Sequence, residues 1–163
     1  MQALGAIYND YPTLILFLHV ISAVVWVGGM IAMRFAAHHS FMALKEPPRR
    51  LERITHALKR LFTIVAPFVV ILLLTALMMA VSMDLHQSEQ ASWVFAKEAI
   101  WTIMALNYLL MVLRRNKAER LIESGNLIDA KRMIGPIGTF MVPFNILLGI
   151  VAIYLGVTLR FGG

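Results

Sequence analysis

A single histidine stands in the otherwise apolar run LFLHVISAVVWVGG, residues 16–29. A neutral imidazole offers one hydrogen-bond donor and one acceptor, and it is the usual axial ligand of a b-type haem. Ser22 and Trp26 follow His19 at i+3 and i+7, so a helix places all three on one face, which we expect to point inward. Two interpretations stay open: a packed histidine bonded to the backbone of another helix, or a ligand or catalytic group.

Three further polar residues lie within or beside apolar runs: Lys97, Asn145 and Arg34. A polar side chain at membrane depth is costly, so it normally faces the protein interior and has a partner or a function. Lys97 lies one turn inside its run, at nearly the depth predicted for His19. A lysine in that position can also extend to the membrane interface, and Glu98 offers it an ion-pair partner.

Met79, Met83 and His86 are spaced i, i+4 and i+7, which predicts one stripe on a helix that ends at the membrane surface. Thioethers and an imidazole suit Cu(I), and a methionine can also be the second axial ligand of a haem. The alternative is that the methionines are apolar filler, because the chain contains 11 of them. The remaining histidines, flanked by arginines, are candidates for a metal or haem edge or are ordinary solvated residues: His38, His39 and His56.

The composition indicates a membrane protein, since 60% of the 163 residues are hydrophobic. Four apolar runs approach the roughly 20 residues that a bilayer requires, at residues 12–33, 61–83, 93–113 and 137–159. The sequence therefore predicts an all-α, integral membrane four-helix bundle that forms one domain over residues 1–163. The absence of cysteine excludes disulfides, thiolate metal sites and covalently attached c-type haem.

The charges favour loops between membrane helices over a nucleic-acid interface, although the net charge is +6. All lysines and arginines except Lys97 and Arg160 fall within residues 34–60 and 114–132. Basic loops stay in the cytoplasm, so both termini are predicted on the outer, periplasmic side of a bacterial inner membrane. We expect the first helix to reach about Leu44, a break at the following prolines, and a second helix from about Arg50.

Several residues predict how the helices end, bend and approach one another. Gly125 is suited to end a helix in the left-handed conformation and Asn126 to begin the next. Prolines in the second and fourth runs predict kinks, and glycines in the first and fourth predict close helix contacts. These residues are, in order, Pro67, Pro143, Gly28, Gly29, Gly149 and Gly156.

The pattern of His19, Trp26, Arg34 and then His38 or His39 resembles the first helix of the HemJ family. The resemblance continues with KRLF before Pro67, with Trp93 and Lys97 in WVFAK, and with Phe144–Asn145. HemJ proteins are small bacterial membrane protoporphyrinogen IX oxidases thought to carry b-type haem. The LH…WVGG signature is equally similar to the CopD superfamily of copper-resistance membrane domains. The HemJ resemblance implies that His19 is a haem ligand or catalytic group and that Lys97 binds a substrate propionate.

Three functions follow as hypotheses. The first is a haem-b oxidoreductase that acts on a tetrapyrrole and passes electrons to a quinone or the respiratory chain, with Trp26, Arg34, His39 and Asn145 around the cofactor. The second is a CopD-like copper protein in which Met79, Met83 and His86 form an outer site and His19 lies deeper. The third is a non-catalytic accessory subunit packed against a larger respiratory membrane complex. Independently of function, the expected partners include a second copy of the chain in a homo-oligomer, or a larger membrane complex.

Overall fold

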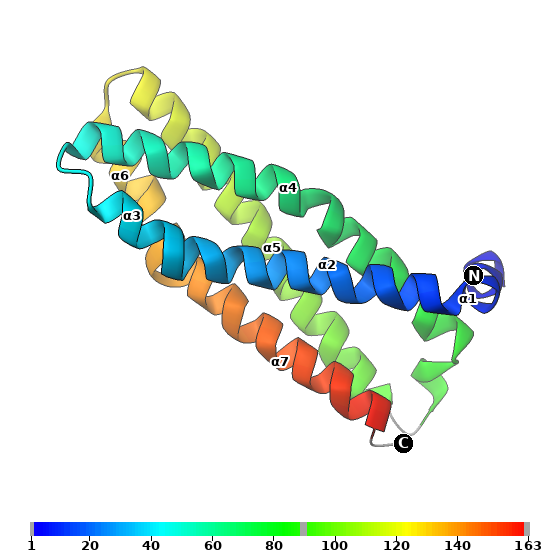
Figure 1. Cartoon of the computed structure of the whole chain (residues 1–163). Coiled ribbons are helices and arrows are strands. Elements are labelled where there is room, and N and C mark those ends of the chain that lie inside the picture. The colour runs from blue at the N-terminus through cyan, green and yellow to red at the C-terminus, as the bar shows by residue number, and fades with distance from the viewer. Residues whose placement is uncertain (1, 89–90, 162–163) are drawn as a thin grey trace.

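The computed structural model describes residues 2–88 and 91–161, which form helices and short connections with no strand among them. The elements are α1 Gln2–Asp10, α2 Pro12–Ala32, η1 Met33–Ala37, α3 His38–Met42, α4 Pro47–Ser82, η2 Leu85–Gln87, α5 Ala91–Glu123, α6 Leu127–Pro136, η3 Ile137–Met141 and α7 Val142–Phe161. Figure 1 shows them as an elongated bundle of long helical segments, which we call rods. The predicted all-α bundle is confirmed.

Four continuous helical segments are long and apolar enough to cross a membrane: Pro12–Met42, Pro47–Ser82, Ala91–Glu123 and Leu127–Thr158. Each covers one predicted run to within one residue and extends beyond it at one end or at both. The start of α2 and the end of α7 lie at one end of the bundle, together with η2 (Figure 1). We call this the terminal end. The opposite end, which carries the α3–α4 and α5–α6 connections, is called the basic end.

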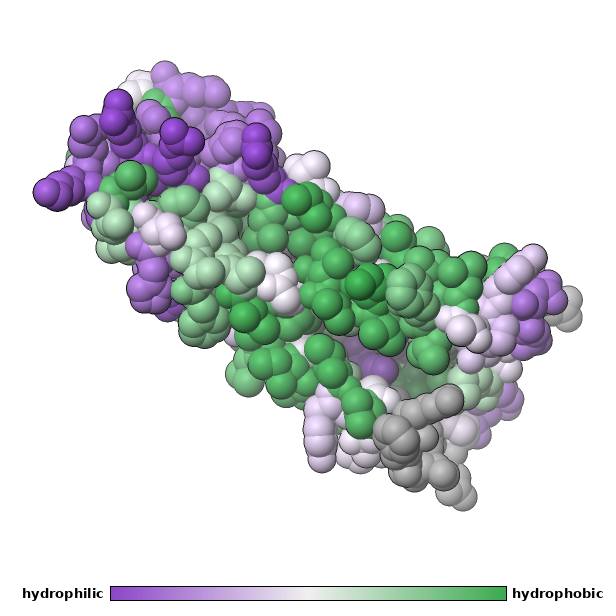
Figure 2. All heavy atoms as spheres, viewed as in Figure 1, coloured by the Kyte–Doolittle hydropathy of each residue, from purple (hydrophilic) through white to green (hydrophobic). Residues whose placement is uncertain are grey.

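The surface pattern agrees with a membrane protein. Figure 2 shows a broad hydrophobic belt between hydrophilic ends, of which the basic end is the more hydrophilic. Many large apolar side chains in the belt are exposed, including Phe17, Leu106, Phe140 and Tyr154, the last at 69%. In water such exposure would be unfavourable, whereas lipid tails solvate these groups.

The prolines beside the first connection begin a helix, which differs from the prediction. Helix α4 starts at Pro47 rather than near Arg50, because a proline at the first helical position loses no hydrogen bond. The second connection follows the prediction. Gly125 has a φ of +80°, and the Asn126 side chain accepts a hydrogen bond from the Asp129 amide at the start of α6.

Two π-helical segments were not predicted from the sequence. η1 joins α2 to α3, and η3 joins α6 to α7. η3 ends at Met141, two residues before Pro143, and α4 continues through Pro67. Kinks in helices occur mainly at prolines and π-bulges. We therefore attribute the irregular stretch between α6 and α7 to η3 and Pro143. Helix α1, which we did not predict, packs on α4, where Ser82 donates to Asn9 at 2.6 Å.

Two of the four glycines predicted at helix contacts lie where neighbouring helices pack too closely for a larger side chain. A Cβ on Gly149 would lie 2.5 Å from Val27 Cγ2, and one on Gly29 would lie 3.0 Å from Leu61 Cδ1. Gly28 is different, because it is exposed and has nothing within 4 Å of its Cβ position. Gly156 faces the Lys97 ammonium instead of a backbone.

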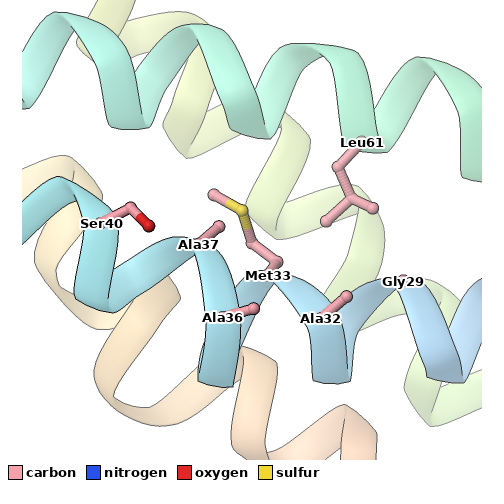
Figure 3. A pocket seen from close by; sticks show the side chains of 7 residues that line it. All are labelled: Gly29, Ala32, Met33, Ala36, Ala37, Ser40 and Leu61. Atoms are coloured by element: carbon pink, nitrogen blue, oxygen red, sulfur yellow. The ribbon is translucent and has the colours of Figure 1, made fainter.

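A shallow groove runs along α2, η1 and α3 beside Leu61 of α4. Figure 3 shows its small side chains along one helix face. The lining residues are Gly29, Ala32, Met33, Ala36, Ala37, Ser40 and Leu61. Because Ser40 supplies the only polar side chain there, the groove offers helix-packing surface and no chemistry.

Candidate functional site

His19 on α2 is joined to Thr75 on α4 across the bundle. The distance from His19 Nδ1 to Thr75 Oγ1 is 3.0 Å. The Thr75 hydroxyl already donates to the carbonyl of Ile71 at 2.7 Å, one turn back in its own helix. With that proton committed, the hydroxyl oxygen is available to accept from His19, and we assign the imidazole proton to Nδ1 on this basis. A backbone hydrogen bond to Leu72 of α4 also holds the ring. Nε2 is then an unprotonated nitrogen, and no described residue donates to it.

Lys97 on α5 supplies a positive charge beside this imidazole. Lys97 is close enough to His19 to act on it electrostatically. Its Nζ would lie 3.2 Å from a Cβ at position 156, so the ammonium rests against α7. Lys97 forms no hydrogen bond or ion pair with another described residue. Glu98, the ion-pair partner that the sequence offered, is bonded to His86 at 2.9 Å instead. Three helices thus bring together an imidazole, a hydroxyl and an unpaired ammonium.

The approach to this centre lies between α2 and α7. The two helices are in contact where Gly149 meets Val27, and they separate toward the terminal end (Figure 1). Figure 2 shows a recess in this part of the surface, with hydrophilic atoms between apolar walls. His19 and Lys97 are both only partly buried. Neither side chain is therefore fully enclosed by the bundle.

No protein-family model, curated protein or solved structure matches this chain. The resemblance to HemJ and CopD proteins thus stays a hypothesis, and the geometry of the side chains is the evidence for function.

Trp26 and Asn145 lie in the middle of the bundle, away from the recess. Trp26 is 1% exposed and packs edge-to-face on Tyr108, with ring centroids 6.2 Å apart. Its indole N–H has no partner among the described residues. Asn145 is fully buried, donates to the Met104 carbonyl at 3.1 Å and accepts from Asn107 at 2.7 Å. In this structure Asn145 connects α5 to α7.

Arg34 and His39 lie at the basic end, although the sequence grouped them with His19. Arg34 lines a cavity of about 660 Å³, together with His38. His39 is exposed and donates to the carbonyl of Phe35 at 2.9 Å, one turn back in the helix. The structure therefore separates the predicted cofactor residues along the bundle: His19 toward the terminal end, Trp26 and Asn145 in the middle, and Arg34 and His39 at the basic end.

The predicted stripe of Met79, Met83 and His86 is interrupted. Helix α4 ends at Ser82, and the left-handed Asp84, with φ of 49°, turns the chain before the short η2. Met83 accepts a hydrogen bond from Tyr8, and His86 pairs with Glu98. Only Met79 remains on the helix, one turn beyond Thr75. Among the described residues no cluster of three or more histidine and acidic side chains is suited to hold a metal.

Three polar residues in the interior were not predicted as site residues from the sequence. Thr75 fixes His19, and Asn107 bonds to both Asn145 and the Met141 carbonyl. Arg115 is 3% exposed, donates to the Thr55 carbonyl at 3.1 Å and pairs with Glu119. Asn107 could have been found, because it is an amide inside an apolar run. Thr75 could not, since a threonine in a membrane helix commonly bonds to its own backbone.

Proposed function

We propose that this protein is a b-type haem-dependent oxidoreductase of the bacterial inner membrane, related in chemistry to HemJ-type protoporphyrinogen IX oxidases. One observation carries the proposal: Nε2 of His19, in the apolar segment of α2, has no hydrogen-bond partner and lies near an ammonium with no hydrogen-bond or ion-pair partner, both among the described residues. A ligand that satisfies both groups needs an atom that accepts a nitrogen lone pair and also an anionic group. A metalloporphyrin with carboxylate side chains has both.

The donor set fits a haem. A histidine that ligates a metal usually donates its other ring N–H to a protein oxygen, which fixes the tautomer and orients the ring. Thr75 supplies that oxygen here. His19 Nε2 would hold the iron, and Lys97 would bind a propionate of the haem or of a tetrapyrrole substrate. The haem, when bound, supplies one-electron redox chemistry at this position.

The surrounding protein strengthens both interactions. The attraction between an ammonium and a carboxylate grows as the local dielectric constant falls, so apolar walls make Lys97 a better recognition group than it would be in water. Gly156 leaves room for the ammonium, because any side chain there would contact it. The lateral recess admits an amphiphilic substrate, and a membrane quinone is the class of electron acceptor that reaches it by the same route.

The decisive experiment is a reduced-minus-oxidised visible spectrum of the detergent-purified protein, produced in cells with adequate haem supply. We expect b-type bands in the wild type and in His86→Ala, the control, and their loss in His19→Ala. Thr75→Val should keep the imidazole but shift or weaken the bands, because Nδ1 loses its acceptor. A colourless wild-type protein refutes the haem proposal and favours copper binding or an accessory role. If the bands persist in His19→Ala, His19 is not the haem ligand.

We also propose that the basic end lies in the cytoplasm, in accordance with the distribution of lysine and arginine. The natural chain contains no cysteine, so single introduced thiols report without background. Gln87→Cys and Lys117→Cys are matched probes, because both positions are exposed, one at each end of the bundle. A membrane-impermeant maleimide added to spheroplasts should label Gln87→Cys alone. Labelling of Lys117→Cys alone reverses the orientation.

A further inference from the structure

The basic end contains a second candidate site, independent of His19. Its cavity of about 660 Å³ lies between α3, the start of α4, and the α6–η3 segment. The walls are mostly apolar, with Phe41, Leu51, Ile54 and Ile134 among them. The charged side chains that line it are all basic: Arg34, Arg50 and Lys131, with His38 beside them, and no acidic residue contributes to the lining.

These basic groups have no partners within the described chain. No hydrogen bond or ion pair joins Arg34, Arg50 or Lys131 to another described residue. Of the acidic residues near them in sequence, Glu46 binds Arg49 at 3.2 Å and Asp129 binds Arg132 at 3.3 Å. Glu52 is exposed and does not line the cavity. An unpaired cluster of one sign around an apolar cavity is complementary to an amphiphile with an anionic group.

Both π-helical segments contribute to this one cavity. η1 supplies Met33 and Arg34, and η3 supplies Ile137, Gly138 and Thr139. π-Helical turns are uncommon, and they occur frequently at functional sites. Two of them on separate rods, facing the same cavity, point to a binding role for this end of the bundle.

We propose that this cavity binds an anionic phospholipid from the leaflet at the basic end. The phosphate contacts Arg34, Arg50 and Lys131, and an acyl chain lies along the apolar wall. A soluble anion does not account for the apolar lining, and a neutral lipid does not account for the cations. The cavity lies at the basic end, where Figure 2 shows the hydrophobic belt passing into hydrophilic surface, and a lipid headgroup lies at such a boundary.

The test is native mass spectrometry of the full chain in mild detergent, titrated with phosphatidylglycerol or phosphatidylcholine. We expect preferential binding of phosphatidylglycerol. Loss of two basic contacts in Arg34→Gln/Arg50→Gln should weaken this binding by roughly 30-fold. The control is Arg53→Gln/Arg60→Gln, which removes equal charge from exposed positions of α4 outside the cavity and should bind as the wild type does.

A second variant tests the cavity without changing charge. A Cβ on Gly138 has nothing within 4 Å, so Gly138→Leu can place its side chain in the cavity space. This variant should lose phosphatidylglycerol binding as well. Equal binding of the two lipids overturns the proposal, as does an equal effect of the two arginine pairs. Displacement of the lipid by millimolar inorganic phosphate, with Gly138→Leu unaffected, assigns the cations to a free anion and also overturns it.

Discussion

Replacing Gly149 by alanine is expected to destabilise the bundle, although alanine is the better helix former. Gly149 lies on α7 where it crosses α2, and a Cβ there would approach Val27 Cγ2 to 2.5 Å and Met104 Cε to 3.3 Å. Carbon atoms in favourable contact are about 3.5–4.0 Å apart, so the first contact is about 1 Å too short. Val27 cannot readily rotate away, because a valine in a helix has one strongly preferred rotamer.

The expected magnitude follows from two opposing terms. Overfilling a packed interior by one methyl group costs about 1–3 kcal/mol. Alanine in place of glycine within a helix recovers up to about 1 kcal/mol. The free energy of unfolding of Gly149→Ala should therefore fall by about 1–2 kcal/mol. Gly28→Ala is the matched control, because its Cβ meets nothing within 4 Å. We expect it to be neutral or more stable by up to about 1 kcal/mol.

The assay is unfolding by sodium dodecyl sulfate in mixed micelles, followed by circular dichroism. A double-mutant cycle adds Val27→Ala, which removes the methyl group that Gly149→Ala would meet. In that background Gly149→Ala should cost at least about 1 kcal/mol less than in the wild type. Equal stability of Gly149→Ala and Gly28→Ala would refute the assigned crossing of α2 and α7. A double-mutant cycle that shows no coupling between Gly149→Ala and Val27→Ala would refute the assigned crossing as well.

Four further variants test polar contacts by the same unfolding assay. Thr75→Val should lower stability by about 0.5–2 kcal/mol, because the N–H of His19 loses its acceptor within the bundle; a neutral result argues against the assigned tautomer. Asn145→Leu should cost about 2–3 kcal/mol, because it leaves buried partners unsatisfied on α5, and no loss would contradict that connection. Glu119→Ala should cost about 2–3 kcal/mol by unpairing a buried arginine. Glu46→Ala, at an exposed pair, should change stability by less than about 1 kcal/mol, and equal losses would contradict the difference in burial.

The rods and their connections could be predicted because they depend on local chemistry. Apolar runs of sufficient length specify membrane helices, and Gly125 followed by Asn126 specifies a turn and a cap. The π-helices could not be predicted, because one extra residue in a turn leaves no periodicity that a sequence reveals. Nor could Gly28 and Gly29 be distinguished: both are small, and only the packed structure places Gly29 against Leu61.

The sequence predicted which types of residue form the candidate site, but it did not predict which of them lie together. An imidazole and an ammonium in apolar runs identified His19 and Lys97. Their partners depend on which faces of separate helices meet, which the sequence does not specify. Thr75 was missed for that reason, and Glu98 was expected to be able to pair with Lys97, whereas it pairs with His86.

The positions of His19 and Arg34 on one continuous helical segment argue for two separate sites. At 1.5 Å per residue, the fifteen steps between them correspond to roughly 22 Å along the rod. One small ligand that contacts His19 and Lys97 therefore does not reach the cavity that Arg34 lines. Binding of haem near the terminal end and of lipid at the basic end should respond to different substitutions. If Arg34→Gln/Arg50→Gln abolished the haem spectrum while the fold stayed intact, the two sites would be coupled and this separation would be wrong.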